Sequence, residues 1–455
     1  MTSFHPVPAL LGRHQPHDLI ATGSASRTVS QLGADVRSIA ERLPVPPRTQ
    51  HGTAAELILV CHDRYLFVAA MLAAWERGYV VALPPNAQEK TIASLRTNGA
   101  VITVLHDVDG MAGIDVRPIV SEAASSLEPS YVPPTLASDR RVVVVYTSGT
   151  TGTPMACPKT AGQLIGEARL LCRTFDIVKG DRVLATVPPH HIYGLLFGVL
   201  VPLVSGASFC RETVLHAEPL AALIAQNDVR VLVSVPAHLR ALRILEQGRI
   251  GKLPRIFSSG APLLAETAHD LSDRFGWVCT EVLGSSETGG IAWREQPDAP
   301  WTPFHGVNIT EGAGGRMLVD SPFTDPSAPR PWVSGDRISL LPNGNFRHLG
   351  RVDGVLKIGS TRVSIAELEA RLLGIPGVTD AAAIAVEVGG ARGWESRALV
   401  AGTGLSPSSI RAALLPWLDP VVIPRRIRIV DALPRDPTGK LRREVMNSFL
   451  GVPEK

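Results

Sequence analysis

The chain has 455 residues, of which 45% are apolar and 19% charged, a composition typical of a globular protein with two or three domains. The formal net charge is only +3, and the lysines and arginines are spread along the sequence, which argues against a nucleic-acid-binding surface. The five cysteines form no CxxC pair and there is no long uncharged apolar run, so we expect no zinc site or disulfide framework, no membrane span and a cytoplasmic location.

Apolar runs alternate with helical patterns through the first 350 residues. Glu56–Cys61 predicts a buried strand, Tyr65–Arg77 has helical spacing, and Gly78–Leu83 predicts the next strand. Further strands are expected at Val101–Leu105, Val142–Tyr146, Arg182–Val187, Val231–Val235 and Arg255–Ser258. Such repetition is typical of parallel sheets covered by helices on both faces. The sequence therefore predicts an α/β fold, whose large N-terminal domain, residues 1–350, has parallel or mixed sheets sandwiched by helices.

The pattern changes near residue 350. Ile338–Leu341 and Phe346–Leu349 flank a Pro342-Asn343-Gly344 turn and predict a hairpin. Later elements are expected at Ile365–Leu373 (helix), Ala381–Val386 (strand) and Pro407–Leu415 (helix, with Ser406 as its N-cap). We therefore expect a small, mobile α+β domain over residues 354–455, joined to the large domain through residues 351–353.

The segment Val142–Pro154, VVVVYTSGTTGTP, carries the strongest functional signal. A buried strand runs into seven consecutive Thr, Ser or Gly residues, Thr147–Thr153. Glycine permits positive φ, so successive backbone N–H groups can point into one concavity, and the hydroxyl groups add donors. Such a loop suits a polyphosphate, although it is not a Walker loop, because GxxxxGK[ST] is absent.

This loop resembles the phosphate loop of the acyl-adenylate-forming superfamily, which includes acyl-CoA synthetases, luciferases and the adenylation domains of peptide synthetases. Four further segments resemble the motifs of that superfamily in the same order: Gly284-Ser285-Ser286-Glu287 (GxTE), Ser334-Gly335-Asp336 (TGD), Gly350-Arg351-Val352-Asp353 (GRxD) and Leu433–Lys440 (LPxxxxGK). Each segment alone is weak, but five in order identify the chain as similar to this superfamily over almost its whole length.

The resemblance implies an AMP-forming acid–thiol ligase. Such an enzyme uses ATP and Mg²⁺ to convert a small carboxylic acid to acyl-AMP, then passes the acyl group to coenzyme A or to the phosphopantetheine of an acyl carrier protein. Catalytic roles are implied for Lys440 at the α-phosphate, Glu287 as Mg²⁺ ligand and His191 beside the acyl carboxylate. The implied nucleotide-binding residues are Thr147, Ser148, Gly149, Thr150, Thr151, Gly152, Lys159, Gly260, Ala261, Pro262, Leu283, Gly284, Ser285, Ser286, Asp336, Arg351 and Arg362. The implied acyl-pocket residues are His190, Tyr193, Gly194, Val235, Pro236, Ser259 and Val282.

Several of these roles are specific. Asp336 is expected to accept from the ribose hydroxyls, and Asp353 to be the hinge about which the C-terminal domain rotates between the two half-reactions. Met155 replaces the lysine that usually follows the loop's proline, so Lys159 is expected to serve the γ-phosphate instead. Ser360 stands where the superfamily has a glycine.

The sequence also bears on the acid. Adenylation domains for amino acids pair the ammonium group with an aspartate, but there is no Asp or Glu between Arg182 and Cys210. A buried ammonium without a counter-charge is costly. The segment Pro188–Gly194 resembles that of acyl- and aryl-CoA synthetases, so we expect an aryl or medium acyl acid.

Two narrower interpretations and two alternatives remain open. TSGTTGTP, the following Pro158-Lys159-Thr160 and GSSETGG resemble the AMP-ligases of aryl-polyene and xanthomonadin pigment clusters, which load a separate carrier protein. An ordinary CoA ligase is the competing subclass. A luciferase-type monooxygenase would share the adenylation step. A catalytically inactive nucleotide-binding homologue would explain Met155 and Ser360, but not the joint presence of Glu287, Asp336 and Lys440.

Overall fold

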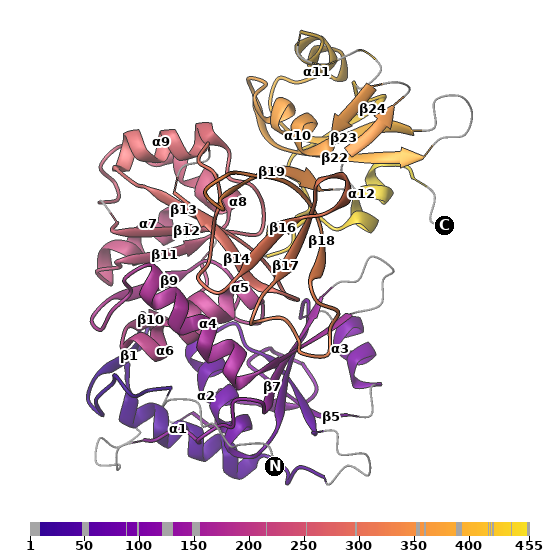
Figure 1. Cartoon of the computed structure of the whole chain (residues 1–455). Coiled ribbons are helices and arrows are strands. Elements are labelled where there is room, and N and C mark those ends of the chain that lie inside the picture. The colour runs from indigo at the N-terminus through magenta and orange to yellow at the C-terminus, as the bar shows by residue number, and fades with distance from the viewer. Residues whose placement is uncertain are drawn as a thin grey trace. The chain divides into compact units, whose positions relative to one another are not determined.

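The structure is a computed structural model, and it describes residues 10–47, 54–87, 89–97, 100–120, 131–147, 155–214, 216–251, 253–295, 298–351, 355–358, 361–387, 394–416, 418, 420, 423–437 and 439–452 (Figure 1). The chain divides into two compact units. The first consists of Met1–Ala299, Phe304–Val307 and Asp320–Pro329, and the second of Pro300–Pro303, Asn308–Val319 and Arg330–Lys455.

The first unit contains a six-stranded sheet in the order β6-β5-β3-β4-β7-β8. Its strands are β3 (Glu56–Val60), β4 (Val80–Leu83), β5 (Val101–His106), β6 (Ile114–Asp115), β7 (Arg141–Thr147) and β8 (Met155–Thr160). Pairing is parallel except between β7 and β8, where Val143 lies opposite Lys159. Every residue of β3 and β4 is buried, as expected of strands covered on both faces. The helices α2 (Arg64–Glu76) and α3 (Glu89–Arg96) connect strands of this sheet.

A second sheet of the first unit runs in the order β14-β13-β12-β11-β9-β10-β1-β2. Its strands are β1 (Leu19–Thr22), β2 (Arg27–Thr28), β9 (Arg182–Ala185), β10 (Ser208–Cys210), β11 (Val231–Ser234), β12 (Arg255–Ser258), β13 (Cys279–Ser285) and β14 (Gly289–Arg294). From β1 to β13 the neighbouring strands are parallel, whereas β13 and β14 form an antiparallel hairpin.

The remaining helices of the first unit follow the alternation of strand and helix. They are α1 (Val29–Arg42), α4 (Ala161–Thr174), α5 (Ile192–Leu195), a π-helical turn (Leu196–Leu200), α6 (Val201–Ser205), α7 (Ala217–Gln226), α8 (Pro236–Ala241), a 3₁₀ turn (Leu242–Ile244) and α9 (Ala265–Phe275). Buried side chains of α7 and α9, such as Leu220 and Leu271, share one apolar cluster with Leu232 and Ile256 of the sheet.

The second unit contains small sheets, with antiparallel pairing at β17–β18–β19, β20–β21 and β22–β23 and parallel pairing at β23–β24. Its strands are β15 (Thr302–Pro303), β16 (Asn308–Glu311), β17 (Arg316–Asp320), β18 (Trp332–Leu340), β19 (Phe346–Arg351), β20 (Val355–Ile358), β21 (Thr361–Ser364), β22 (Val378–Glu387), β23 (Trp394–Gly402) and β24 (Arg426–Val430). Helices α10 (Ile365–Leu373) and α11 (Pro407–Leu414) cluster with Ala398 and Val400, whereas α12 (Arg443–Leu450) clusters with Leu399 and Ala401. Alternate residues of β23 therefore face helices on opposite sides of its sheet, as the two-residue period requires.

The predicted α/β fold is confirmed, and the strands and helices expected from the sequence are present. The division into units places the hairpin β18–β19 with the C-terminal residues. A boundary at 351–353 with Asp353 as hinge stays a prediction, because residues 352–354 lie outside the described ranges. Among the helices that the structure describes, none combines the length and the apolar character needed to cross a membrane.

Candidate active site

Most residues expected around the acyl group and adenine lie at one edge of the second sheet of the first unit. Strands β9, β11, β12 and β13 are parallel, so their carboxyl ends meet at the same edge. His190–Gly194 follow β9, Val235 and Pro236 follow β11, Gly260–Pro262 follow β12, and Val282–Ser286 end β13. Ligands of open α/β sheets bind outside the carboxyl ends of the strands. The fold therefore brings these four groups of predicted residues together.

A row of buried hydroxyl groups lines this edge, and sequence reasoning missed it. Thr186 Oγ1 lies 3.0 Å from Ser234 Oγ and 2.9 Å from His238 Nδ1. Ser258 Oγ is fully buried and has no partner among the described residues. Burial, with a smaller contribution from His216, lowers the pKa of His238 to about 4, so this imidazole is neutral at pH 7. The missed signal was a hydroxyl residue at the end of each apolar strand.

The predicted His190 and His191 lie next to each other at this edge. Their ring centroids are 4.5 Å apart; His190 is buried and His191 is half-buried at the start of α5. The segment before them is held by the fully buried Arg64, which donates to the carbonyl oxygens of Ala185 at 3.1 Å and Val187 at 3.0 Å. Burial lowers the pKa of Arg64 to about 10, so its guanidinium stays charged at neutral pH.

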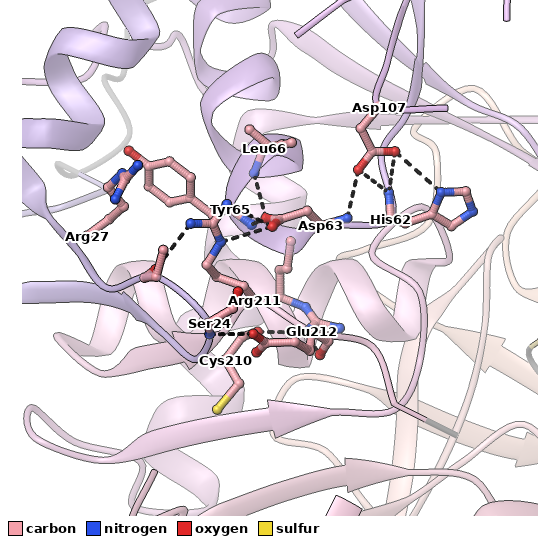
Figure 2. A network of polar contacts seen from close by, with 12 residues as sticks. Ser24, Arg27, His62, Asp63, Tyr65, Leu66, Asp107, Cys210, Arg211 and Glu212 are labelled. Carbon is pink, nitrogen blue, oxygen red and sulfur yellow. Dashed lines mark hydrogen bonds and ion pairs between the residues drawn. The ribbon is translucent and has the colours of Figure 1, made fainter. Parts of the chain in front are cut away.

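Polar contacts around the start of α2 tie the two sheets of the first unit together (Figure 2). Asp63 caps the helix by accepting from the backbone N–H groups of Tyr65 and Leu66, and it pairs with Arg211 at 2.8 Å. Asp107 accepts from the backbone N–H of Asp63 at 2.8 Å. This network fixes Arg64, the first residue of α2, relative to the carboxyl end of β9.

Glu287 lies at the tip of the β13–β14 hairpin, in the turn Ser286–Thr288. Ser285 Oγ accepts from the backbone N–H of Thr288 at 3.2 Å, and Ser321 Oγ donates to the Thr288 carbonyl at 2.8 Å. Gly289 has φ of 70°, and a Cβ there would lie 2.8 Å from Phe323 Cβ, so this position requires glycine. The turn is thus held from several sides, and it presents the half-buried Glu287.

Lys159 occupies a different position from the one expected. Its side chain is only 1% exposed, and Nζ donates to the carbonyl oxygens of Phe323 at 2.7 Å and Glu287 at 3.1 Å. Burial lowers the pKa of this ammonium, which the carboxylate of Glu167 attracts. The ammonium points into the interior, towards the Glu287 turn, and the expected contact with the γ-phosphate stays a prediction.

The residues around Glu287 fit a Mg²⁺ ion that arrives with a nucleotide. Among the described residues, no group of three or more His, Cys, Asp or Glu side chains could hold a metal. Mg²⁺ does not require such a cage, because it keeps several waters and is commonly bound by one or two carboxylates together with phosphate oxygens. A single half-buried carboxylate at the tip of a fixed turn is consistent with that mode.

In the second unit, the predicted Asp336 is held by two neighbours. Ser334 Oγ donates to Asp336 Oδ2 at 2.6 Å, and His348 Nε2 lies 3.0 Å from Asp336 Oδ1. Asp336 on β18 is paired with Arg351 on β19. His348 was not predicted, although it lies in the hairpin that the sequence indicated.

Lys440 is exposed at the end of a turn in the second unit. Asp436 closes the turn: its backbone N–H donates to the Lys440 carbonyl at 2.8 Å, and its Oδ1 accepts from the Lys440 N–H at 3.0 Å. Arg435 donates to the Gly439 carbonyl and to both oxygens of Asp380, which ties the turn to β22. These hydrogen bonds hold the backbone of the turn, while the long side chain of Lys440 is exposed to solvent.

Part of the expected site cannot be placed. Thr147 is the last residue of β7. The loop residues Ser148, Gly149, Thr150, Thr151 and Gly152 lie outside the described residues, as does Asp353. The backbones of Arg351 and Arg362 lie in β19 and β21.

The chain is similar to known proteins over much of its length. The sequence profile of the family described as "AMP-binding enzyme" matches residues 12–310. The chain is 26% identical over 452 residues to an L-proline–[L-prolyl-carrier protein] ligase of Pseudomonas fluorescens, covering 86% of this chain and 88% of that protein. It is 32% identical over 314 residues to a 4-coumarate–CoA ligase of Rhodobacter capsulatus, covering 67% of this chain and 76% of the relative.

Solved structures show the same fold. The o-succinylbenzoate coenzyme A synthetase of Bacillus subtilis in complex with AMP superposes with a TM-score of 0.80 at 19% identity, covering 97% of this chain and 98% of the other. The same enzyme in complex with ATP and a magnesium ion also gives a TM-score of 0.80, covering 97% and 99%.

Proposed function

The chain belongs to the AMP-binding enzyme family, and from that premise we propose that it activates an aryl or medium acyl acid with ATP and transfers the acyl group to the thiol of a separate carrier protein. The coarser function, an AMP-forming acid–thiol ligase, follows from the family and from relatives that are ligases for carrier proteins or CoA. The acid and the acceptor are the finer part of the proposal.

The observation that carries the proposal is the position of Glu287. Its turn closes the hairpin at the carboxyl end of β13, and it contacts β8, the strand that follows the glycine-rich segment. The carboxylate proposed to bind the metal thus belongs to a turn that contacts the strand following the proposed phosphate-binding segment. Glu287 would hold Mg²⁺, which when bound would neutralise charge on the phosphate groups.

Other residues are assigned the remaining roles in the reaction. Attack of a carboxylate on the α-phosphate of ATP brings two anions together, so positive charge and fixed orientation are needed. We assign the charge to the exposed Lys440, the orientation of the acid to His191, and ribose binding to Asp336. Pyrophosphate leaves. The incoming thiol then attacks the acyl carbonyl of acyl-AMP, forming the thioester and releasing AMP.

Two observations support an aryl or acyl acid. The rings of Tyr193, Phe197 and Phe257 form a continuous aromatic cluster that starts at the predicted pocket residue Tyr193, with successive centroids 5.1 and 4.9 Å apart. The stretch from Arg182 to Cys210 contains no carboxylate that could pair with an ammonium. The Rhodobacter relative is named for 4-coumarate, an aryl acid, whereas the Pseudomonas relative is named for L-proline, which keeps an amino acid as the alternative substrate.

Exposed arginines of the second unit favour a carrier protein as acceptor. Arg426 and Arg428 donate to the carbonyl oxygens of Leu450 and Phe449, so their charges are fixed in place without being neutralised by these contacts. Carrier proteins are typically acidic, and such complementarity acts largely on the association rate. If this is correct, a carrier protein outcompetes CoA at equal concentration and turnover falls with salt. Preference for CoA at low salt would make the chain an ordinary acyl-CoA or aryl-CoA ligase.

The direct test of the activation step is product analysis without any thiol. Enzyme, Mg²⁺, ATP and a hydroxyaryl or medium acyl acid are mixed, and the products are identified by mass spectrometry. We expect enzyme-bound acyl-AMP and released pyrophosphate. Formation of ADP and phosphate, or no product while ATP still binds, would favour a different reaction or the inactive homologue.

A further inference from the structure

We propose that Lys159 is a positioning residue for the nucleotide–metal site: its buried ammonium fixes the backbone of the Ser286–Thr288 turn and thereby sets the position of the Glu287 carboxylate. This inference rests on the proposed function, in which Glu287 holds Mg²⁺. It replaces the phosphate contact expected for Lys159 with a structural contact to the metal-binding turn.

Two side chains on one face of β8 contact Glu287, one at its carboxylate and one at its backbone carbonyl. Side chains alternate along a strand, so Cys157 and Lys159 project to the same side, and both are buried. Cys157 Sγ lies 3.9 Å from Glu287 Oε1, and Lys159 Nζ lies 3.1 Å from the Glu287 carbonyl oxygen. Strand β8 begins at Met155, directly after the glycine-rich segment. The inward face of β8 therefore contacts Glu287 at both its carboxylate and its carbonyl group.

A second contact of the ammonium makes it a bridge between segments that are distant in sequence. Nζ also donates to the Phe323 carbonyl at 2.7 Å, and Ser321, two residues earlier, holds the Thr288 carbonyl. Lys159 and the Ser321–Phe323 segment thus bind consecutive carbonyl groups of the same turn. A side chain of equal size without a donor would leave the carbonyl oxygens of Glu287 and Phe323 without this partner.

Glu167 on α4 contacts the β14 side of the same hairpin tip. Its Oε1 accepts from the backbone N–H of Gly290 at 2.6 Å, while Oε2 has no hydrogen-bond partner among the described residues and faces Gly289. Both Lys159 and Glu167 are 1% exposed. Two opposite charges in the interior are expensive to bury, and a fold that needed only packing here could use apolar side chains. The pair holds the Glu287 carbonyl and the Gly290 N–H, the two sides of the hairpin tip.

The test compares Lys159→Met with Gln163→Leu. Gln163 Nε2 donates to the Thr324 carbonyl at 2.7 Å, next to Phe323, and among the described residues no hydrogen bond joins Gln163 to the Glu287 turn. Binding of Mn²⁺ to the enzyme with ATP present is measured by electron paramagnetic resonance, which does not depend on turnover. We expect Lys159→Met to weaken Mn²⁺ binding about tenfold or more, as loss of a group that orients a metal ligand does. Gln163→Leu should stay within twofold of the wild type.

ATP binding is measured in parallel in the presence of EDTA, and the KM for the acid is determined from turnover. The proposal predicts that metal-free ATP binding and this KM change little in Lys159→Met. It is overturned if Lys159→Met and Gln163→Leu weaken Mn²⁺ binding equally, which indicates a general packing role. It is also overturned if Lys159→Met weakens ATP binding to the same extent without metal, because that result would restore the phosphate contact.

If Lys159→Met does not fold, Ser321→Ala provides the second variant, since it removes the hydrogen bond to the adjacent Thr288 carbonyl together with the one that Ser321 Oγ accepts from the backbone N–H of Phe323. We then expect Mn²⁺ binding to weaken in Ser321→Ala, and unchanged binding would overturn the proposal. A wild-type enzyme that binds no Mn²⁺ with ATP and forms no acyl-AMP would instead reject the proposed function itself, before any variant is compared.

Discussion

His348 Nε2 lies 3.0 Å from Asp336 Oδ1, across the β18–β19 hairpin. Together with the 2.6 Å hydrogen bond from Ser334 to Oδ2, this contact fixes the orientation of the carboxylate that we assign to the ribose. A hydrogen bond to a charged group contributes more than one between neutral groups.

We therefore expect His348→Ala to weaken ATP binding about tenfold while the fold is retained. Isothermal titration calorimetry with ATP measures the effect. Arg347→Ala is the matched control, because Arg347 is the preceding residue of β19 and is exposed. Equal ATP affinity in the His348 and Arg347 variants would mean that His348 does not orient Asp336.

Glu287→Gln should lower the rate of acyl-AMP formation by about 10²–10³, the range seen for loss of one preorganised electrostatic group. The amide keeps the shape of the side chain but removes the charge that favours a divalent cation. Rates are measured over a Mg²⁺ titration, with the exposed Glu295→Gln as control. A Glu287 variant with wild-type rate and Mg²⁺ dependence would remove Glu287 from the metal site.

Lys440→Ala should cost about 10²–10³ in acyl-AMP formation, since this exposed ammonium is assigned to the α-phosphate and the attacking carboxylate. Thioester formation from supplied acyl-AMP should continue, because Lys440 has no assigned role in that step. The two half-reactions are assayed separately. An equal loss in both would contradict the assignment of Lys440 to the first half-reaction alone.

We expect His238 to make the free energy of unfolding depend on pH. Burial lowers its pKa to about 4 in the folded chain, against about 6.5 when exposed. Between pH 4 and pH 6.5 the unfolded chain binds more protons at His238 than the folded chain does. The free energy of unfolding therefore falls as the pH drops from 6.5 towards 4. The effect is about 2–3 kcal/mol across the window. Chemical denaturation at pH 4.5 and pH 7 should show a smaller pH difference for His238→Gln; parallel curves for both proteins would contradict the assignment.

The sequence predicted those features that depend on local pattern. The apolar runs predicted the strands, and the family resemblance pointed to His191, Val235 and Gly260, which lie at the carboxyl-end edge of the second sheet. Ser406 also caps α11 as expected, by accepting from the backbone N–H of Ser409.

Other features depend on which strands become neighbours, and these could not be predicted. Lys159 follows a loop in which lysines often bind phosphate, but pairing of β8 with β7 turns this residue towards the interior. The contact between Thr186 and His238 requires β9 and β11 to be adjacent, although 45 residues separate the two strands. His348 approaches Asp336 only because of the register of the β18–β19 hairpin.

The central claim is that this chain activates a carboxylic acid as its adenylate. Acid-dependent exchange of labelled pyrophosphate into ATP measures that step directly, with a panel of hydroxyaryl acids, medium acyl acids and free amino acids including L-proline. We predict Mg²⁺-dependent exchange with at least one aryl or acyl acid and none with the amino acids. Exchange with an amino acid alone would contradict the proposed acid, and no exchange with any acid, despite measurable ATP binding, would contradict the central claim.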